Sequence, residues 1–164
     1  MRKFIVLAAM ALALAGCHRP QPVADQSAAS KVFLAKNAKQ PGVQTLPSGL
    51  QFKVVHEGPK DGLRPQLGDE VKVNYEGKLA ATGKVFDSSY ERGQPAAMPL
   101  KGLIRGWQEA LQLMRPGDEW ILYVPPELGY GAEGAGDEIP PGAALIFRIE
   151  LIDILPGPET IQKG

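Results

Sequence analysis

The sequence has 164 residues, of which 18 are basic and 18 acidic, so its formal net charge at pH 7 is zero. This balance gives no electrostatic reason to bind nucleic acid. Its hydrophobic content of 44% and charged content of 22% are typical of a globular protein. The single cysteine, Cys17, excludes an internal disulfide, and His18 and His56 have no further ligand pattern around them. We therefore expect neither a metal nor another cofactor.

The N-terminal segment MRKFIVLAAMALALAGC predicts export. Two basic residues precede an apolar run from Phe4 to Ala15, which is shorter than the roughly 20 residues that a membrane span needs. A charged start, a short apolar middle and small residues at the end are typical of a secretory signal. The alternative is a buried N-terminal helix that ends at an unrelated cysteine. The export hypothesis assigns residues 1–16 to a signal peptide.

The residues Leu14-Ala15-Gly16-Cys17 resemble a bacterial lipobox. The resemblance implies that Cys17 is lipidated and becomes the mature N-terminus in the cell envelope. More than one acyl chain gives stable membrane anchoring. The next residue is His18 and not the Asp that signals inner-membrane retention in enteric bacteria, so we expect an outer-membrane anchor that faces the periplasm.

Residues 17–43 are expected to connect this anchor to the folded domain. The stretch from His18 to Ser30 is rich in Pro, Gln, Ser and Ala, which is typical of a flexible spacer. We expect a short helix that is capped by Ser30 and stopped by Pro41-Gly42. Its apolar face is small and its length marginal, so it is predicted to be a helical stub.

Residues 44–156 carry the patterns of an antiparallel sheet. In DEVKVNYEGKLA, alternate residues from Val71 to Leu79 share one face, and polar residues share the other. Further strands are predicted in SGLQFKVVHEG, GKVFDSS, EWILYVPP and ALIFRIELIDIL, with a proline-interrupted edge strand in QPAAMPL. One segment, IRGWQEALQLMRPGD, has helical spacing instead, with a stop at Pro116-Gly117.

These patterns predict an α+β fold, in which a twisted antiparallel sheet forms a half-barrel around one short amphipathic α-helix. Residues 44–156 would form this domain, and residues 157–164 a flexible C-terminal tail. The glycine-rich loop after Tyr130 carries Glu133, Asp137 and Glu138 and no Lys or Arg, so it would repel a phosphate. We expect it to be a flexible flap between Tyr130 and the last strand.

Several motifs resemble those of FKBP-type peptidyl-prolyl cis/trans isomerases in order and spacing. These motifs, spread from about Leu46 to Leu155, are VNYEGKL, GKVFDSS, LIRGWQEALQLMRPGD, PPELGYG and IPPGAALIFRIELIDI. The segment FLAKNAKQPGVQTLPSGLQFKVV is similar to the bacterial Mip-like branch, whose members are often exported and often dimeric through a longer N-terminal helical region. That region is a stub in this sequence, so we expect a monomer, with a dimer as the alternative.

The resemblance implies a proline pocket between the helix and the concave face of the sheet, with the flap over its mouth. The residues that it places at the catalytic site are Tyr75, Phe86, Asp87, Ile104, Trp107, Tyr130 and Phe147. The residues that it places beside them, in contact with substrate, are Leu103, Ile139 and Met98. By the same resemblance, the Ile104 N–H and the Tyr130 hydroxyl hold peptide carbonyls, and Asp87 orders Tyr75.

Without the resemblance, the same residues have ordinary structural explanations. Trp107, Phe86 and Phe147 would be core aromatics, and Asp87 would be a turn-forming carboxylate. The implied function is prolyl isomerisation of unfolded or partly folded exported envelope proteins, by an apolar pocket that stabilises the twisted amide without a covalent intermediate. The alternatives are an FKBP-like module that binds clients or a partner with little turnover, and a chaperone with modest isomerase activity.

Overall fold

A seven-stranded antiparallel sheet dominates the structure, a computed structural model that describes residues 24–157. Its order is β1-β2-β6-β7-β3-β4, and β5 pairs with β3. The strands are β1 (Val43–Thr45), β2 (Gln51–His56), β3 (Glu70–Leu79), β4 (Val85–Ser88), β5 (Ala96–Pro99), β6 (Glu119–Val124) and β7 (Leu145–Leu155). The two end strands of this order, β1 and β4, do not pair with each other, so the sheet is open, as the half-barrel prediction requires. The fold class predicted from the sequence is confirmed.

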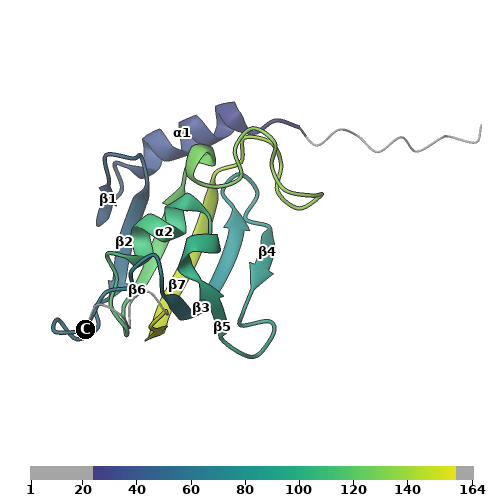
Figure 1. Cartoon of the computed structure of the whole chain (residues 1–164). Coiled ribbons are helices and arrows are strands. Elements are labelled where there is room, and N and C mark those ends of the chain that lie inside the picture. Colours follow the sequence, from purple (N-terminus) through teal and green to yellow (C-terminus); the bar gives the residue numbers. More distant parts are fainter. Residues whose placement is uncertain (1–23, 158–164) are drawn as a thin grey trace, which may run out of the picture.

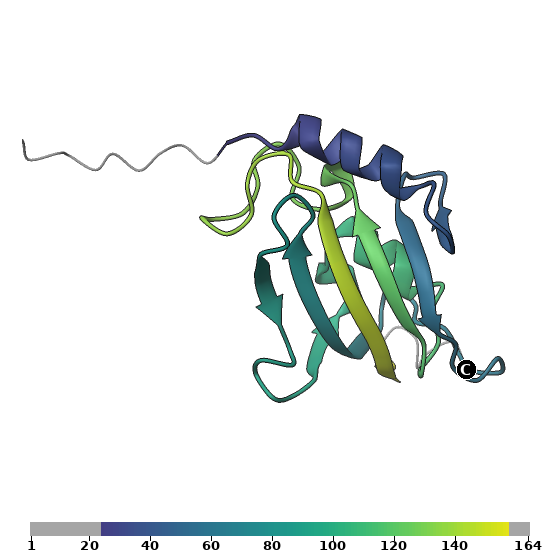
Figure 2. The same cartoon turned by 180° about the vertical axis from the view of Figure 1, so that it is seen from behind.

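The predicted helix lies against one face of this sheet as α2 (Arg105–Leu111), and α1 (Ser27–Asn37) lies across one end of it (Figures 1 and 2). Two short 3-10 helices, η1 (Leu100–Gly102) and η2 (Pro126–Leu128), complete the described elements. Within residues 24–157, neither helix has the length and apolar character that crossing a membrane requires. The predicted signal peptide, the predicted lipidation site Cys17 and residues 158–164 of the predicted C-terminal tail lie outside the described residues. Gly157, which the sequence assigned to this flexible tail, is buried, and its N–H donates to Asp69 Oδ1 at 3.1 Å.

The two longest strands, β3 and β7, pair along their whole length at the centre of the sheet. Val73 lies opposite Leu151 and Gly77 lies opposite Phe147, after a bulge between Lys72 and Val73. The alternation predicted for β3 is confirmed, because its apolar residues are buried beneath α2 while Glu70 and Lys72 are exposed. This face of the sheet and α2 together enclose the hydrophobic core.

Helix α2 is shorter than the sequence predicts, because it ends at Leu111 and not at Pro116-Gly117. The residues that follow form a turn that is stabilised by a local hydrogen bond and by one to β7. The Asp118 carboxylate accepts the Arg115 N–H, and the Gly117 N–H donates to the Leu151 carbonyl of β7. Met114 nevertheless stays buried, as its place in the helical pattern suggested.

Helix α1 differs from the prediction in its start. It begins at Ser27, and Ser30 is a buried residue in its second turn and not its cap. The helix attaches to the sheet through polar groups: the Asn37 amide donates to the Gln51 side chain at 2.8 Å, and the Gln51 amide donates to the Leu34 carbonyl at 2.9 Å. The stub is therefore packed on the domain, although its apolar face is small.

A buried carboxylate joins the start of β6 to the loop after β2. Asp118 accepts the backbone N–H groups of Gly58 at 2.6 Å and Arg115 at 2.8 Å. We expect Asp118→Ala to lower the free energy of unfolding by about 1–3 kcal/mol, because two partly buried N–H donors lose a charged acceptor. Urea denaturation measures this loss. The control is Asp153→Ala, which removes an exposed carboxylate with a purely local bond and should cost under about 0.5 kcal/mol; equal losses would contradict the prediction.

Candidate active site

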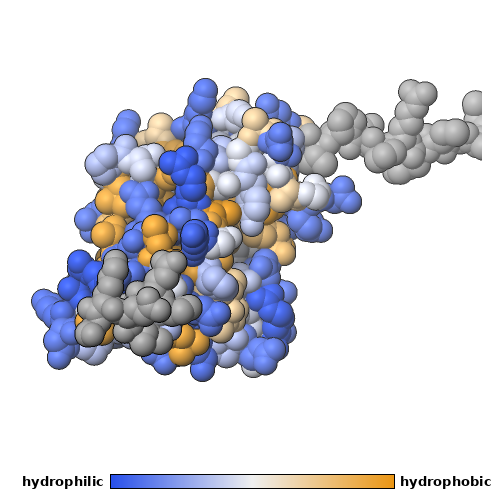
Figure 3. Space-filling model, viewed as in Figure 1, coloured by the Kyte–Doolittle hydropathy of each residue, from blue (hydrophilic) through white to orange (hydrophobic). Residues whose placement is uncertain are grey.

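A cavity of about 220 Å³ opens between α2, the sheet and the loop that begins at Tyr130. Its lining residues come from separate segments of the chain and are mostly apolar. They are Tyr75, Phe86, Asp87, Met98, Gly102, Leu103, Ile104, Trp107, Tyr130 and Phe147. On this side of the molecule, apolar patches interrupt a largely hydrophilic surface (Figure 3).

The structure brings together every residue that the sequence placed at the site except Ile139. Ile139 belongs to the loop itself; its side chain is buried in the hydrophobic core and does not line the cavity. Its backbone pairs with Ala135 through two hydrogen bonds, which folds the loop back on itself. Gly102, which belongs to none of the sequence motifs, also lines the cavity.

The cavity walls are aromatic rings that meet edge to face. The Trp107 ring lies 5.1 Å from that of Tyr75 and 5.2 Å from that of Phe147, with interplanar angles of 83° and 88°. Phe86 meets Phe147 in the same way, at 5.7 Å. This geometry is favourable for aromatic pairs, so the rings hold each other in fixed orientations. The buried Trp107 indole N–H has no hydrogen-bond partner among residues 24–157, so packing alone positions this ring.

Gly77 makes room for two of these rings. It lies in β3 opposite Phe147, and a side chain at this position would point into the aromatic cluster. A Cβ atom there would lie 2.6 Å from Phe147 Cε1 and 2.8 Å from Phe86 Cζ. Such distances are well below van der Waals contact, so the close approach of both phenyl rings to the backbone requires glycine.

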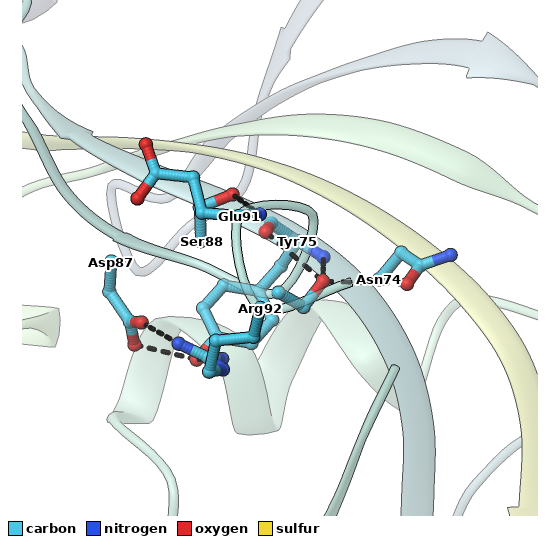
Figure 4. A network of polar contacts seen from close by, with 7 residues as sticks. Asn74, Tyr75, Asp87, Ser88, Glu91 and Arg92 are labelled. Carbon is cyan, nitrogen blue, oxygen red and sulfur yellow. Dashed lines mark hydrogen bonds and ion pairs between the residues drawn. The ribbon is translucent and has the colours of Figure 1, made fainter. Parts of the chain in front are cut away.

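The polar side of the cavity is a three-residue network of Tyr75, Asp87 and Arg92 (Figure 4). The Tyr75 hydroxyl donates to Asp87 Oδ2 at 2.6 Å and accepts from Arg92 Nη2 at 2.8 Å. The Arg92 guanidinium also forms an ion pair with Asp87 and lies 5.4 Å from the centre of the Tyr75 ring. Both charged groups are substantially exposed, so the pair adds little to stability. Its effect is to fix the Tyr75 hydroxyl.

Besides the buried Trp107 indole N–H, two donors at the cavity are free for a ligand. The hydrogen bonds found within residues 24–157 use neither the backbone N–H of Ile104, which precedes α2, nor the hydroxyl of Tyr130. Both residues line the cavity. The site therefore combines an apolar floor with a small number of available donors, which is the usual composition of a small-ligand pocket.

The ionisable groups of the site keep one protonation state over the neutral range. Partial burial acts to raise the pKa of Asp87, but the hydrogen bonds from Tyr75 and Arg92 together outweigh it, so the pKa is lowered. Burial raises the pKa of Tyr130, and the Asp87 charge adds to this effect. Burial and the hydrogen bond to Asp87 also raise the pKa of Tyr75, while Arg92 acts in the opposite direction. Asp87 is thus ionised and both phenols are protonated at neutral pH.

These pKa directions predict how the site responds to pH. Because the folded pKa of Asp87 is depressed, the stabilisation by its charge is fully present above the ordinary value of about 3.9 and is lost as the pH falls through the folded value. We expect kcat/KM for any reaction at this site to be constant from about pH 5 to pH 9 and to fall below about pH 4. A pH profile measures this, and an ionisation near pH 7 in that profile would contradict it.

Comparison with known proteins identifies the family. The sequence model for FKBP-type peptidyl-prolyl cis-trans isomerases matches residues 62–152, and the model for the domain amino-terminal to such isomerases matches residues 9–54. The chain therefore belongs to the FKBP-type peptidyl-prolyl cis-trans isomerase family, as the motifs suggested.

Curated relatives and solved structures agree with this assignment. The peptidyl-prolyl cis-trans isomerase Mip of Coxiella burnetii is 56% identical over 125 residues, which cover 76% of this chain and 53% of that protein. The FKBP-type 22 kDa isomerase of Escherichia coli is 50% identical over 75% of this chain and 58% of its own length. The chain thus spans only about half the length of these relatives. The crystal structure of FkpA from Escherichia coli has a TM-score of 0.75 at 44% identity, over 80% of this chain and 60% of that one.

A peptidyl-prolyl isomerase of Pseudomonas syringae is of more similar size. Its crystal structure has a TM-score of 0.72 at 40% identity. The aligned residues cover 92% of that chain and 79% of this one. This similarity shows that the described fold occurs in a solved isomerase with little additional structure.

Proposed function

We propose that this protein is a peptidyl-prolyl cis/trans isomerase whose activity resides in residues 44–156. The observation that carries the proposal is the aromatic cavity of about 220 Å³ over Trp107, with the Ile104 N–H and the Tyr130 hydroxyl free beside it. An unassisted X–Pro bond isomerises over tens to hundreds of seconds, so a catalyst of this step is useful wherever proteins fold.

The residues of the cavity suit this reaction. Rotation about a peptide bond is opposed by a barrier of about 18–20 kcal/mol, because twisting breaks the amide resonance. The twisted amide has less charge separation than the planar amide, so an apolar cavity disfavours the planar form relative to water. An interaction that is stronger in the twisted state accelerates the reaction, and no bond to the enzyme is needed.

Each residue has a proposed part in holding the twisted peptide. Trp107, with Phe86 and Phe147 beside it, would pack against the proline ring. The Ile104 N–H and the Tyr130 hydroxyl would hold peptide carbonyls near the proline. Leu103 and Met98 would contact the flanking residues of the substrate, and Asp87 would keep the Tyr75 side chain in place. Ile139, whose side chain is buried, would act indirectly by packing the loop onto the core.

Isomerisation of short X-Pro peptides by the whole chain tests the proposal. We expect turnover well above the spontaneous rate, and a loss of about five- to tenfold in kcat/KM for Tyr130→Phe, which removes one donor. Tyr90→Phe is the matched control, because Tyr90 is similarly exposed (44% against 40%) and lies outside the cavity. No turnover by the folded protein would exclude the enzyme and favour a binding module.

We also propose a location and a substrate class. The N-terminal segment supports residues 1–16 as a signal peptide and Cys17 as a lipidated residue that anchors the protein in the outer membrane, facing the periplasm. The substrates would be incompletely folded, proline-containing exported proteins. Incorporation of labelled palmitate by the parent but not by Cys17→Ser, with loss of membrane association, is the expected result. A soluble, unlabelled parent protein would overturn the anchor.

A further inference from the structure

A buried hydroxyl of α1 connects this helix to the loop that carries Tyr130. We call residues 130–144, from Tyr130 to the start of β7, the flap. The Ser30 side chain is only 4% exposed. Its Oγ donates to the Gly142 carbonyl at 2.7 Å and accepts the Ala144 N–H at 2.7 Å. One side chain thus satisfies two backbone groups that lie more than a hundred residues away in the sequence.

Further contacts make this junction tight. The Gln26 N–H, directly before α1, donates to the Pro141 carbonyl at 2.8 Å. Gly142 has a φ of +67°, and a Cβ atom at this position would lie 2.1 Å from Ser27 Oγ. Figures 1 and 2 both show the first turns of α1 beside the loops that lead into β7. The start of α1 is therefore hydrogen-bonded to the backbone at the C-terminal end of the flap.

Residues 141–144 are connected to both sides of the proline cavity. The Gly142 N–H donates to the Gly131 carbonyl at 2.9 Å, which closes the flap at its base next to Tyr130. In the other direction, Ala144 is followed at once by β7, which supplies Phe147 to the cavity wall. A shift of residues 141–144 would consequently move Tyr130, whose side chain is half exposed and has no hydrogen bond of its own within residues 24–157.

We propose that Ser30 is a positioning residue for the isomerase site: by binding Gly142 and Ala144, it fixes the flap base and so keeps Tyr130 at the mouth of the cavity. This inference rests on the proposed function for its catalytic consequence, but the mechanical link can be measured without it. Because a buried hydrogen bond that is lost leaves an unsatisfied partner, replacing Ser30 should favour opening of the flap base.

The chain offers a matched control at the other end of the same helix. Asn37 is also buried in α1, but its side chain donates to the Gln51 side chain of β2 and makes no hydrogen bond to the flap within residues 24–157. Ser30→Ala and Asn37→Ala each remove buried hydrogen bonds between α1 and the domain. We expect only Ser30→Ala to release the flap, because only Ser30 bonds its backbone. Ser30→Cys, nearly isosteric and a weak hydrogen-bonding group, replaces Ser30→Ala if the alanine variant does not fold.

The experiment combines amide hydrogen exchange with isomerisation kinetics on the whole chain, at a temperature where all variants are folded. In Ser30→Ala we expect exchange at Ala144 and Gly142 to become about tenfold faster, with KM for X-Pro peptides about three- to tenfold higher and kcat less changed. In Asn37→Ala we expect these amides and KM to stay within about twofold of the parent. This pattern would support a positioning role for Ser30.

Other outcomes separate the inference from the function. Equal effects of Ser30→Ala and Asn37→Ala on KM, or faster exchange without any change of KM, would show a merely structural role and overturn the inference. A parent protein without turnover would overturn the proposed function. In that case, unchanged exchange at Gly142 in Ser30→Ala would also overturn the link between α1 and the flap, and faster exchange confined to the flap base would support it.

Discussion

Replacing Trp107 by leucine is expected to lower kcat/KM for X-Pro peptides by about 30- to 100-fold, which corresponds to roughly 2–3 kcal/mol of transition-state stabilisation. The indole forms the floor of the cavity and holds the Tyr75 and Phe147 rings edge to face. Leucine would still fill part of the core but would offer no flat surface for a proline ring. The rate is measured with a short X-Pro peptide at several enzyme concentrations.

The other tryptophan of the chain is the natural control for this prediction. Trp120 is 7% exposed against 4% for Trp107, and it stacks on Phe52 at 4.4 Å, outside the proline cavity. Trp120→Leu should lower the stability of the domain and leave kcat/KM within about twofold while the protein is folded. Equal losses of activity in the two folded variants would mean that the indole of Trp107 has no special role.

Adding one methyl group at Gly77 is expected to have the second-largest effect. In Gly77→Ala the new Cβ would overlap the rings of Phe86 and Phe147, and overpacking of this kind costs about 1–3 kcal/mol or more. Because both rings line the cavity, we expect kcat/KM to fall together with the free energy of unfolding. Urea denaturation and peptide isomerisation measure the two losses on the same preparation.

A second substitution can show that the loss arises from these rings. Phe86→Leu removes part of the ring that the new methyl group would meet, so it should cost less in the Gly77→Ala background than in the parent. The coupling free energy from the four proteins is expected to be about 1 kcal/mol or more in favour of the double variant. An additive result would place the cause elsewhere, for example in the pairing of β3.

The sequence predicted those elements whose periodicity is set by burial in the domain. Alternation in β3 and β7 marked both strands, because one face of each packs on the core. The pattern failed at α1, whose buried face includes Ser30 and Asn37. Their partners lie on the flap and on β2, far away in the sequence, and no local pattern records such polar contacts. The same limit explains why α2 was predicted too long, since the turn at Asp118 depends on Gly58 and β7.

At the candidate site, the same residue can be part of the hydrophobic core and part of the cavity wall. Trp107 and Phe147 are core residues by exposure and also form the cavity wall, so periodicity alone could not distinguish the two roles. The motif resemblance supplied the set of residues. It did not supply Arg92, whose role depends on a turn after β4 that folds its guanidinium back onto Tyr75 and Asp87. A motif records the residue types and not the path of the chain between them.

The open sheet has a consequence for a protein that would meet unfolded chains. Exposed strand edges can template the addition of foreign strands and so start aggregation. In this sheet the long strands β3 and β7 are interior, while the outer positions are occupied by short strands: three residues in β1 and four each in β4 and β5. Pro99 in β5 lacks the N–H group that a further strand would need. The edges of the sheet therefore offer a client polypeptide few free backbone groups with which to pair as an added strand.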